Sequence, residues 1–192
     1  MAYLKSNQLS KFFNNKTISV VGNANSLLES NYGTLIDSAD IVCRFNLGPK
    51  LIAPQSHGTR TDWCIYNNYL WASSANAFDI TANCKWLEIN YDFELELDIE
   101  IDAYTLPQES RIKFGNDRSS IGITFLHYLT TCNPKQVNIF GFDWKRTHTW
   151  YNRSRKWKKE RMRSGHNWQK ELDYFKEFIE PLPQYTLHST DN

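Results

Sequence analysis

The sequence predicts one α/β domain over residues 1–192, a Rossmann-like arrangement with a mainly parallel central sheet. Three observations lead to this prediction. The chain is long enough for one sizeable core but short for two. Its apolar runs are short, and two of them end at a glycine, as buried strands often do. Between these runs lie segments with helical spacing, and this alternation is typical of α/β layer folds.

The expected strands follow in chain order. Residues 17–21 (TISVV) end at Gly22, and residues 137–140 (VNIF) end at Gly141, so both indicate a buried strand that turns at a glycine. The other strands are expected at residues 41–44, 62–65 and 85–89.

Two helices are expected in the second half of the chain. In residues 121–132 apolar side chains recur at steps of four, four and three, which places them on one helical face. Steps of four, three and four indicate a second amphipathic helix. Its apolar face consists of Trp168, Leu172, Phe175 and Ile179.

Residues 91–102 follow a different pattern, in which apolar and acidic residues alternate with a period of two. This alternation is typical of a half-exposed strand. The spacing of Asp98, Glu100 and Asp102 also fits an Asp-x-Asp metal pair. Because the alternation extends over five carboxylates, we favour an edge strand protected against aggregation, and we expect no metal site.

Composition excludes several classes of protein. The net charge of +1 gives no indication of a nucleic-acid partner. No apolar run approaches the roughly 20 residues of a membrane span, and the N-terminal residues lack the apolar core of a secretory signal. The cysteines show no metal-ligand spacing, which favours buried free thiols in a reducing compartment. We therefore expect a cytoplasmic protein with four free thiols: Cys43, Cys64, Cys84 and Cys132.

Polar residues follow two of the expected strands. Gly22 and Asn23 can bring backbone N–H groups and a neutral amide close to a phosphate, although a simple turn remains an alternative. Asn46 follows the strand at residues 41–44, where ligand-facing residues of open sheets lie. The spacing is not Gly-x-Gly-x-x-Gly, so a dinucleotide site is not supported.

A second and a third pattern flank the strand at residues 137–140. Ser119 and Ser120 precede the first expected helix, where serines cap N-termini and free N–H groups bind anions. Gly122 lies in the first turn of this helix. His148 and Trp150 follow the strand, and both a ligand role and a structural role remain open for this histidine.

The fourth pattern opens the last expected helix. If His166 lies at the start of that helix, the macrodipole disfavours its protonation. A histidine that is neutral near pH 7 can act as a general base. The alternative is that His166 caps the helix and Gln169 completes a capping box.

In this order, the four patterns resemble the sialyltransferases of glycosyltransferase family 29. The first is similar to the family's large motif, which runs hydrophobic-hydrophobic-Gly-Asn, then Leu, Tyr-Gly, Ile-Asp and Arg-x-Asn. The second, through Gly141-Phe142, resembles the small motif, and residues 148–151 resemble the third motif. Residues 166–171 fit the very small motif, His-x-x-x-x-Glu, and residues 58–61 (GTRT) resemble the turn after the large motif. The resemblance spans about residues 18–171.

The resemblance implies a variant of the GT-A type fold and a role for each matching residue. His148 would bind the donor phosphate, His166 would be the catalytic base, and Glu171 would support the structure. The residues implied in binding the CMP donor are Asn23, Ser26, Asn46, Ser120, Gly122 and Trp150. Ser26 stands where the family often has a second Asn.

The chain also departs from the family pattern. The family's secreted members link the large and small motifs by a disulfide, but the large-motif position is Ile18 here. Ser119 replaces the usual proline. These departures are consistent with a compact form that has no stem or membrane anchor.

The expected activity is the transfer of a sialic acid from CMP-sialic acid to a hydroxyl of a glycan or glycolipid acceptor. The reaction would invert the anomeric centre and need no metal or cofactor, because the CMP-sugar is itself a substrate. One alternative is a transferase that uses CMP-Kdo, and another is a non-catalytic carbohydrate- or nucleotide-binding protein. The basic segment from Arg153 to Arg163 could form a peripheral contact with an anionic membrane or polysaccharide.

Overall fold

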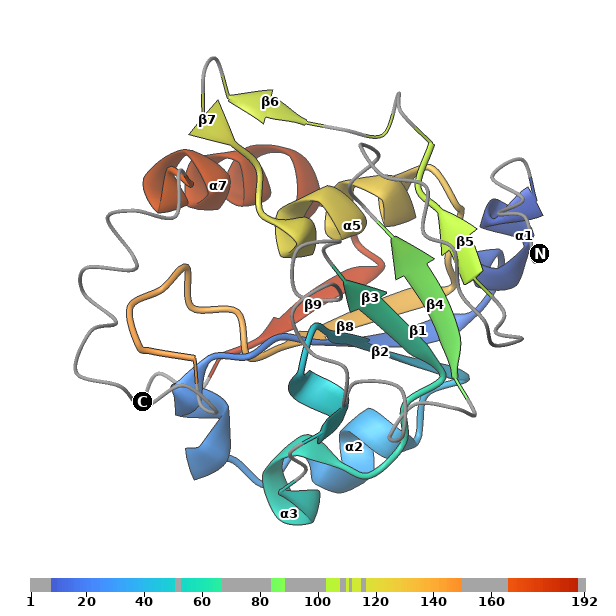
Figure 1. The fold of residues 1–192 in the computed structure, drawn as a ribbon, viewed down its shortest axis with the longest axis vertical. Helices are drawn as coiled ribbons and strands as arrows, with labels where there is room; N and C mark the ends of the chain where they lie inside the picture. Colours follow the sequence, from blue (N-terminus) through green and yellow to red (C-terminus); the bar gives the residue numbers. More distant parts are fainter. Residues whose placement is uncertain are drawn as a thin grey trace, which may run out of the picture.

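The computed structural model describes residues 8–50, 53–66, 84–88, 103–107, 110, 112–114, 117–149 and 166–189. A central sheet carries helices on both of its faces (Figure 1). On one face lie α5 (Ile121–Thr130) and α7 (Trp168–Tyr174), and on the other lie α2 (Gly33–Asp37) and α3 (Pro54–His57). The α/β class predicted from the sequence is therefore confirmed.

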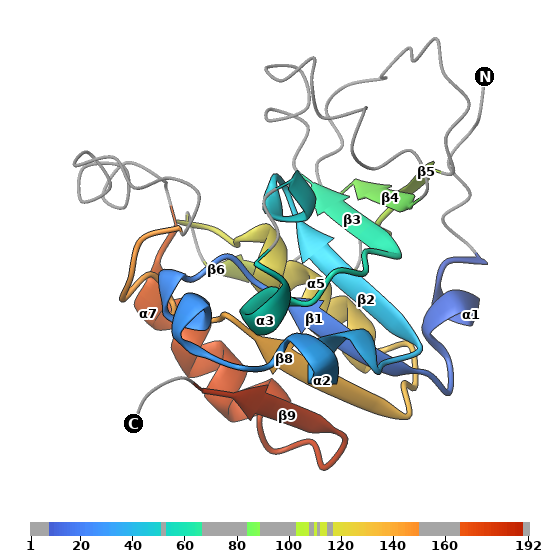
Figure 2. The same cartoon turned by 90° about the horizontal axis from the view of Figure 1, so that it is seen from below.

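Within the described residues, the central sheet has seven strands in the order β5-β4-β3-β2-β1-β8-β9, and every neighbouring pair is parallel. From β1 the chain adds strands outward as far as β5, and β8 then pairs with the other side of β1 (Figure 2). The strand order thus reverses between β1 and β8, and open α/β sheets bind ligands beyond the carboxyl ends of the strands at such a point. The strands are β1 (Thr17–Val21), β2 (Ile41–Phe45), β3 (Trp63–Tyr66), β4 (Lys85–Glu88), β5 (Ala103–Thr105), β8 (Gln136–Phe140) and β9 (Tyr185–His188).

All five strands expected at described positions are present, with ends shifted by one residue at most. The sequence did not predict β5 or β9, nor the antiparallel pair β6 (Lys113–Phe114) and β7 (Asp117–Arg118). The strand expected at residues 91–102 lies outside the described residues.

The expected helices are both present, but their buried faces differ from the predicted ones. In α5 the buried residues extend beyond the single predicted face and also include Ile123, Leu126 and Tyr128. Ile121, which was predicted to be on the buried face, is half-buried. The last helix begins as α7 and continues as the π-helical segment η6 (Phe175–Ile179). The remaining short elements are α1 (Ser10–Phe13), η2 (Asn25–Glu29) and η3 (Gly48–Lys50).

The largest part of the core lies between the sheet and α5. Phe13 packs against Trp63 with ring centroids 5.1 Å apart and against Phe125 at 5.7 Å. Phe45, at the end of β2, packs edge-on against Phe125. The four cysteines are buried free thiols, as expected. None of the helices in the described ranges is long and apolar enough to cross a membrane.

Arg44 of β2 is 1% exposed, and its side chain makes structural contacts with the backbone rather than lining the ligand pocket. Its guanidinium donates to the carbonyl oxygens of His57 and Arg60 at 2.6 and 2.9 Å. Burial lowers the pKa of Arg44 to about 10, so the side chain still carries its charge at neutral pH. Asp37 accepts hydrogen bonds from the Thr59 and Arg60 backbone N–H groups. The turn at residues 58–61 is therefore fixed against β2 and α2.

The ends of β1 and β8 approach each other at two glycines. The N–H of Gly22 donates to the carbonyl of Phe140 at 2.7 Å, and the N–H of Ala24 donates to Gly141 at 3.1 Å. A Cβ on Gly22 would lie only 2.4 Å from the Gly141 carbonyl oxygen. Gly141 also has a φ of +64°, which side chains disfavour. Neither position can accept a side chain without a backbone shift.

Replacing Gly22 by alanine should therefore destabilise the protein. We expect the free energy of unfolding to fall by roughly 1–3 kcal/mol, because the new Cβ meets backbone rather than a flexible side chain. Denaturant unfolding of Gly22→Ala measures this loss. The matched control is Thr34→Ala at an exposed position of α2, which should change stability by less than about 0.5 kcal/mol. Equal stabilities of the two variants would contradict the close approach.

Candidate active site

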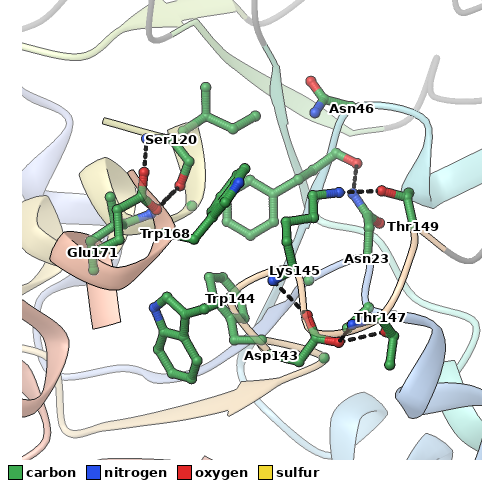
Figure 3. A pocket seen from close by; sticks show the side chains of 18 of the residues that line it. Asn23, Asn46, Ser120, Asp143, Trp144, Lys145, Thr147, Thr149, Trp168 and Glu171 are labelled. Atoms are coloured by element: carbon green, nitrogen blue, oxygen red, sulfur yellow. Dashed lines mark hydrogen bonds between the residues drawn. The ribbon is translucent and has the colours of Figure 1, made fainter. Parts of the chain in front are cut away.

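A pocket of about 170 Å³ opens at the carboxyl ends of β1, β2 and β8. It lies between the loops that follow these strands and the N-terminal ends of α5 and α7 (Figure 3). Among the residues singled out from the sequence, those that line it are Asn23, Asn46, Ser120, Gly122, His148 and Glu171. Ser26 lies in η2 and His166 lies beside the pocket, and neither lines it. Trp150 lies outside the described residues.

Asn23 and Asn46 form the wall beyond β1 and β2. The Asn23 side-chain amide donates to the Phe45 carbonyl at 3.1 Å, which joins the loop after β1 to the end of β2. Asn46 has a φ of +51°, a conformation that asparagine tolerates better than most residues. Its N–H donates to the Ile65 carbonyl at 2.8 Å. The two asparagines are thus fixed at the rim by backbone contacts.

Ser120 caps α5 and also joins it to α7. Its hydroxyl accepts a hydrogen bond from the Ile123 N–H at 3.3 Å, which confirms the expected cap. The Ser120 N–H and hydroxyl both donate to the Glu171 carboxylate at 2.7 Å. Gly122, in the first turn, packs against the Phe142 ring, and a Cβ there would lie 2.8 Å from that ring. The start of α5 is therefore fixed from two sides.

Glu171 is 2% exposed, and its burial raises its pKa to about 7. The two hydrogen bonds from Ser120 oppose this shift because they stabilise the ionised form. Burial has the larger effect. At neutral pH the carboxyl group is therefore divided between its charged and neutral forms.

His166 precedes α7 and is half-buried, with 25% of its side chain exposed. Its Nδ1 lies 2.8 Å from the Arg118 carbonyl oxygen. Because a carbonyl can only accept, Nδ1 carries the proton in the neutral ring and Nε2 carries the lone pair. Burial, with smaller contributions from the charges of Lys145 and Arg118, lowers the pKa of His166. The ring is thus held neutral, as a base requires, with burial as the first cause.

The capping alternative for His166 is wrong. Asn167 is the N-cap of α7, and its side chain accepts from the Lys170 N–H at 3.2 Å. Gln169 instead donates to Asp173 along the helix. The imidazole of His166 lies beside the Trp168 ring, with centroids 5.0 Å apart.

Asp143 organises the loop after β8. Its carboxylate accepts from the Lys145 and Thr147 N–H groups at 2.9 and 2.8 Å and from the Thr147 hydroxyl. This tight turn puts Lys145 in a left-handed conformation, with a φ of +62°. The N–H of Asn25 donates to the His148 carbonyl at 3.0 Å, so the loop is also tied to the chain after β1. His148 is thereby brought to the same pocket as the asparagines.

Sequence reasoning missed part of the pocket. Asp143, Lys145, Thr147, Thr149 and Trp168 all line it. The Lys145 ammonium donates to the Thr149 hydroxyl at 2.5 Å and lies 5.9 Å from the centre of the Trp168 ring. The signal was present, because Lys145 stands between the glycine that ends β8 and His148. The third pattern was interpreted only through its histidine and aromatic residues.

In the described part of the chain, no group of three or more His, Cys, Asp or Glu side chains could hold a metal ion. Residues 98–102, where a metal pair was considered, lie outside that part.

The Ser120–Glu171 contact should contribute to the free energy of unfolding. Glu171→Ala leaves two donors without their partner, and we expect a loss of roughly 1–3 kcal/mol in the free energy of unfolding. Glu171→Gln can accept from the Ser120 N–H and donate to its hydroxyl, so it should lose less.

The pH dependence should separate these variants further. The raised pKa of Glu171 favours the folded state fully below about pH 4.5, and this stabilisation is lost as pH rises through about 7. Wild type should therefore lose stability relative to Glu171→Gln between pH 5 and 8, by at most about 3 kcal/mol. Denaturant unfolding at both pH values measures this difference. Glu177→Gln, at an exposed position, is the control. A pH-independent difference would contradict the assignment.

Comparison with solved structures identifies the fold. A mammalian sialyltransferase in complex with Gal-beta-1-3GalNAc-ortho-nitrophenol aligns with a TM-score of 0.65 at 15% identity, covering 97% of this chain and 74% of that one. A second mammalian sialyltransferase structure gives 0.63 at 16% identity, covering 91% and 69%. The sialyltransferase CstII from Campylobacter jejuni, in complex with the substrate analogue CMP-3FNeuAc, gives 0.54 at 16% identity, covering 86% and 78%. The chain thus has the GT-A-like fold of these proteins.

Comparison by sequence supports the family resemblance for the first part of the chain. No curated protein sequence matches the chain. Residues 5–91 match the model of glycosyltransferase family 29 (sialyltransferase), and this range contains the first pattern and the turn at residues 58–61. The other three patterns lie beyond it. The resemblance to glycosyltransferase family 29 is thereby confirmed over residues 5–91, and the rest of the chain shares the fold of the sialyltransferase structures.

Proposed function

We propose that the protein transfers a sialic acid from CMP-sialic acid to a hydroxyl of a glycan acceptor, with inversion and without a metal, and that His166 is the general base. The observation that supports this most strongly is that two features lie side by side. One is the pocket formed by Asn23, Asn46 and the start of α5. The other is a half-buried, neutral imidazole beside it, whose tautomer leaves the lone pair on Nε2.

The donor half of the pocket suits a nucleotide monophosphate ester. Asn23 and Asn46 offer neutral amides, and α5 offers backbone N–H groups at its N-terminal end, which attract anions. CstII has been solved with cytidine-5′-monophosphate and with CMP-3FNeuAc. A similar fold therefore accepts such a donor, and the same class of donor is proposed for this chain.

The acceptor half suits a single displacement. The acceptor oxygen forms a bond to the anomeric carbon while the bond from that carbon to the phosphate oxygen breaks, and its electron pair stays on CMP. The acceptor proton goes to Nε2 of His166, whose Nδ1 proton remains bonded to Arg118. A positioned base of this kind contributes typically 10²–10⁴-fold. A mammalian structure of similar fold contains Gal-beta-1-3GalNAc-ortho-nitrophenol, which supports a glycan acceptor.

The donor can be tested directly. Purified protein is incubated separately with CMP-Neu5Ac and CMP-Kdo, and CMP release is measured with and without glycan acceptors, in EDTA and in added Mg²⁺ or Mn²⁺. We expect acceptor-dependent release from CMP-Neu5Ac that survives EDTA. If CMP is released from CMP-Kdo but not from CMP-Neu5Ac, the donor is CMP-Kdo rather than CMP-sialic acid. Release from neither donor, while CMP still binds, would favour the non-catalytic binding protein. Turnover lost in EDTA and restored by metal would overturn the metal-independent mechanism.

The two histidines should behave differently when replaced. His166→Asn keeps a side-chain N–H near the position of Nδ1, so the Arg118 contact can persist while the base atom is lost. We expect turnover to fall by roughly 10² or more, with CMP affinity nearly unchanged. His148→Ala, which alters the donor side, should weaken CMP binding along with the rate. Initial rates and calorimetry with CMP measure both effects, and His127→Gln, on α5 outside the pocket, is the control.

The wild-type pH profile provides a second readout. Because the pKa of His166 is lowered from 6.5, kcat/KM should stay high at neutral pH and fall only below pH 6.5, as the base becomes protonated. This fall of kcat/KM at acidic pH should be absent in His166→Asn. Near-wild-type turnover in that variant would show that His166 is not the base.

The predicted contact with an anionic membrane or polysaccharide stays a proposal, because the segment from Arg153 to Arg163 lies outside the described residues.

A further inference from the structure

We propose that Lys145 supplies the positive charge that binds the donor phosphate and stabilises CMP as it leaves. This inference rests on the proposed function and deepens it by assigning a catalytic residue that the motif comparison does not include. From the sequence, phosphate contacts are expected from His148 and from the neutral amide of Asn23, and no role is expected for Lys145.

The position of Lys145 is built into the fold. The residue follows β8 by five positions, and its backbone is fixed by the bond from its N–H to Asp143. Its φ is +62°, and its side chain reaches Thr149 across the pocket. Figure 3 shows the Lys145 side chain extending toward Thr149, beside Asn23 and facing Trp168. The ammonium donates to the Thr149 hydroxyl and lies 5.9 Å from the Trp168 ring centre.

The other charged side chains of the pocket cannot do this task. Asp143 and Glu171 carry the wrong sign, and both direct their oxygens into structural hydrogen bonds, with Thr147 and Ser120 respectively. Among the described residues that line the pocket, Lys145 alone carries the permanent positive charge of a lysine or arginine. The asparagines and the start of α5, which line the same pocket, offer only neutral donors.

The reaction requires charge at this place. When the bond between the anomeric carbon and the phosphate oxygen breaks, the phosphate gains one negative charge and becomes the monoester of free CMP. An ammonium has three N–H groups, so Lys145 can donate to a phosphate oxygen while it keeps the Thr149 contact. The lysine stays protonated throughout, and the acceptor proton still goes to His166. Stabilisation of charge that grows in the transition state lowers the barrier.

Lys145 also acts on the base. Its charge is one of the groups that lower the pKa of His166, together with burial and the charge of Arg118. The Glu171 carboxylate, 3.9 Å from Nδ1, faces the same ring. The ammonium is therefore near enough to both halves of the site to act on the leaving group and on the base.

The test compares two ligands that differ by the phosphate. Calorimetry measures the affinity of wild type, Lys145→Met and Lys145→Asn for CMP and for cytidine. The asparagine variant removes the charge and tolerates the left-handed backbone, so it keeps the test valid if the methionine variant does not fold. Lys135→Met, in the exposed turn before β8, removes the same charge at the opposite end of that strand.

We expect loss of the Lys145 charge to weaken CMP binding at least tenfold and to leave cytidine binding within about twofold. Turnover with saturating donor should fall by roughly 10². Lys135→Met should match wild type in all three measurements. If wild type binds CMP and transfers sugar but the Lys145 variants do so equally well, the Lys145 assignment is overturned and the proposed function stands. If wild type binds neither ligand, the proposed function fails first and this inference fails with it.

Discussion

At the end of β1 the N–H of Gly22 reaches the Phe140 carbonyl, and two residues later the N–H of Ala24 reaches Gly141. This contact between the two strand ends leaves no room for a side chain, and the geometry of the pocket depends on it. The Phe142 ring lies against Gly22 and also against Gly122 of α5. One aromatic ring thus sets the distance between the loop after β1, the loop after β8 and the start of the helix.

The electrostatics of the site follow from that arrangement. On one side of the pocket, the asparagines, the start of α5 and the Lys145 ammonium offer hydrogen-bond donors and positive potential. On the opposite side, burial raises the pKa of Glu171 and lowers that of His166, so neither group is driven to hold a full charge at neutral pH. A site divided in this way suits an anionic leaving group and a neutral base. The same desolvation that keeps His166 neutral makes the Ser120–Glu171 bond costly to break.

Much of the framework could be predicted from the sequence. The strands that end in glycine were found because a buried apolar run and a glycine turn are both local signals. The α5 cap at Ser120 was found for the same reason. The short strands β5 and β9 were missed because runs of three and four residues carry little periodicity. Trp168 and Leu172 were placed on the apolar face of a helix, but both are half-buried because they line pockets.

The site was predicted less completely than the fold. Motif order indicated Asn23, Asn46, Ser120 and His148, which the fold then brings to one pocket. It did not indicate Lys145, which stands between Gly141 and His148 but reaches the pocket through the left-handed turn that Asp143 holds. The neutral state of His166 was expected from the helix dipole, but burial is the larger cause, and burial depends on the packing of α7 against the rest of the chain.

The central claim is that the pocket beyond β1, β2 and β8 holds the CMP half of the donor. A crystal structure of the protein with CMP tests this most directly. The account predicts the nucleotide between Asn23, Asn46 and the start of α5, with its phosphate within hydrogen-bond distance of the Lys145 ammonium. CMP bound instead in the neighbouring cavity, between Arg146, Lys176 and Glu180, would contradict it.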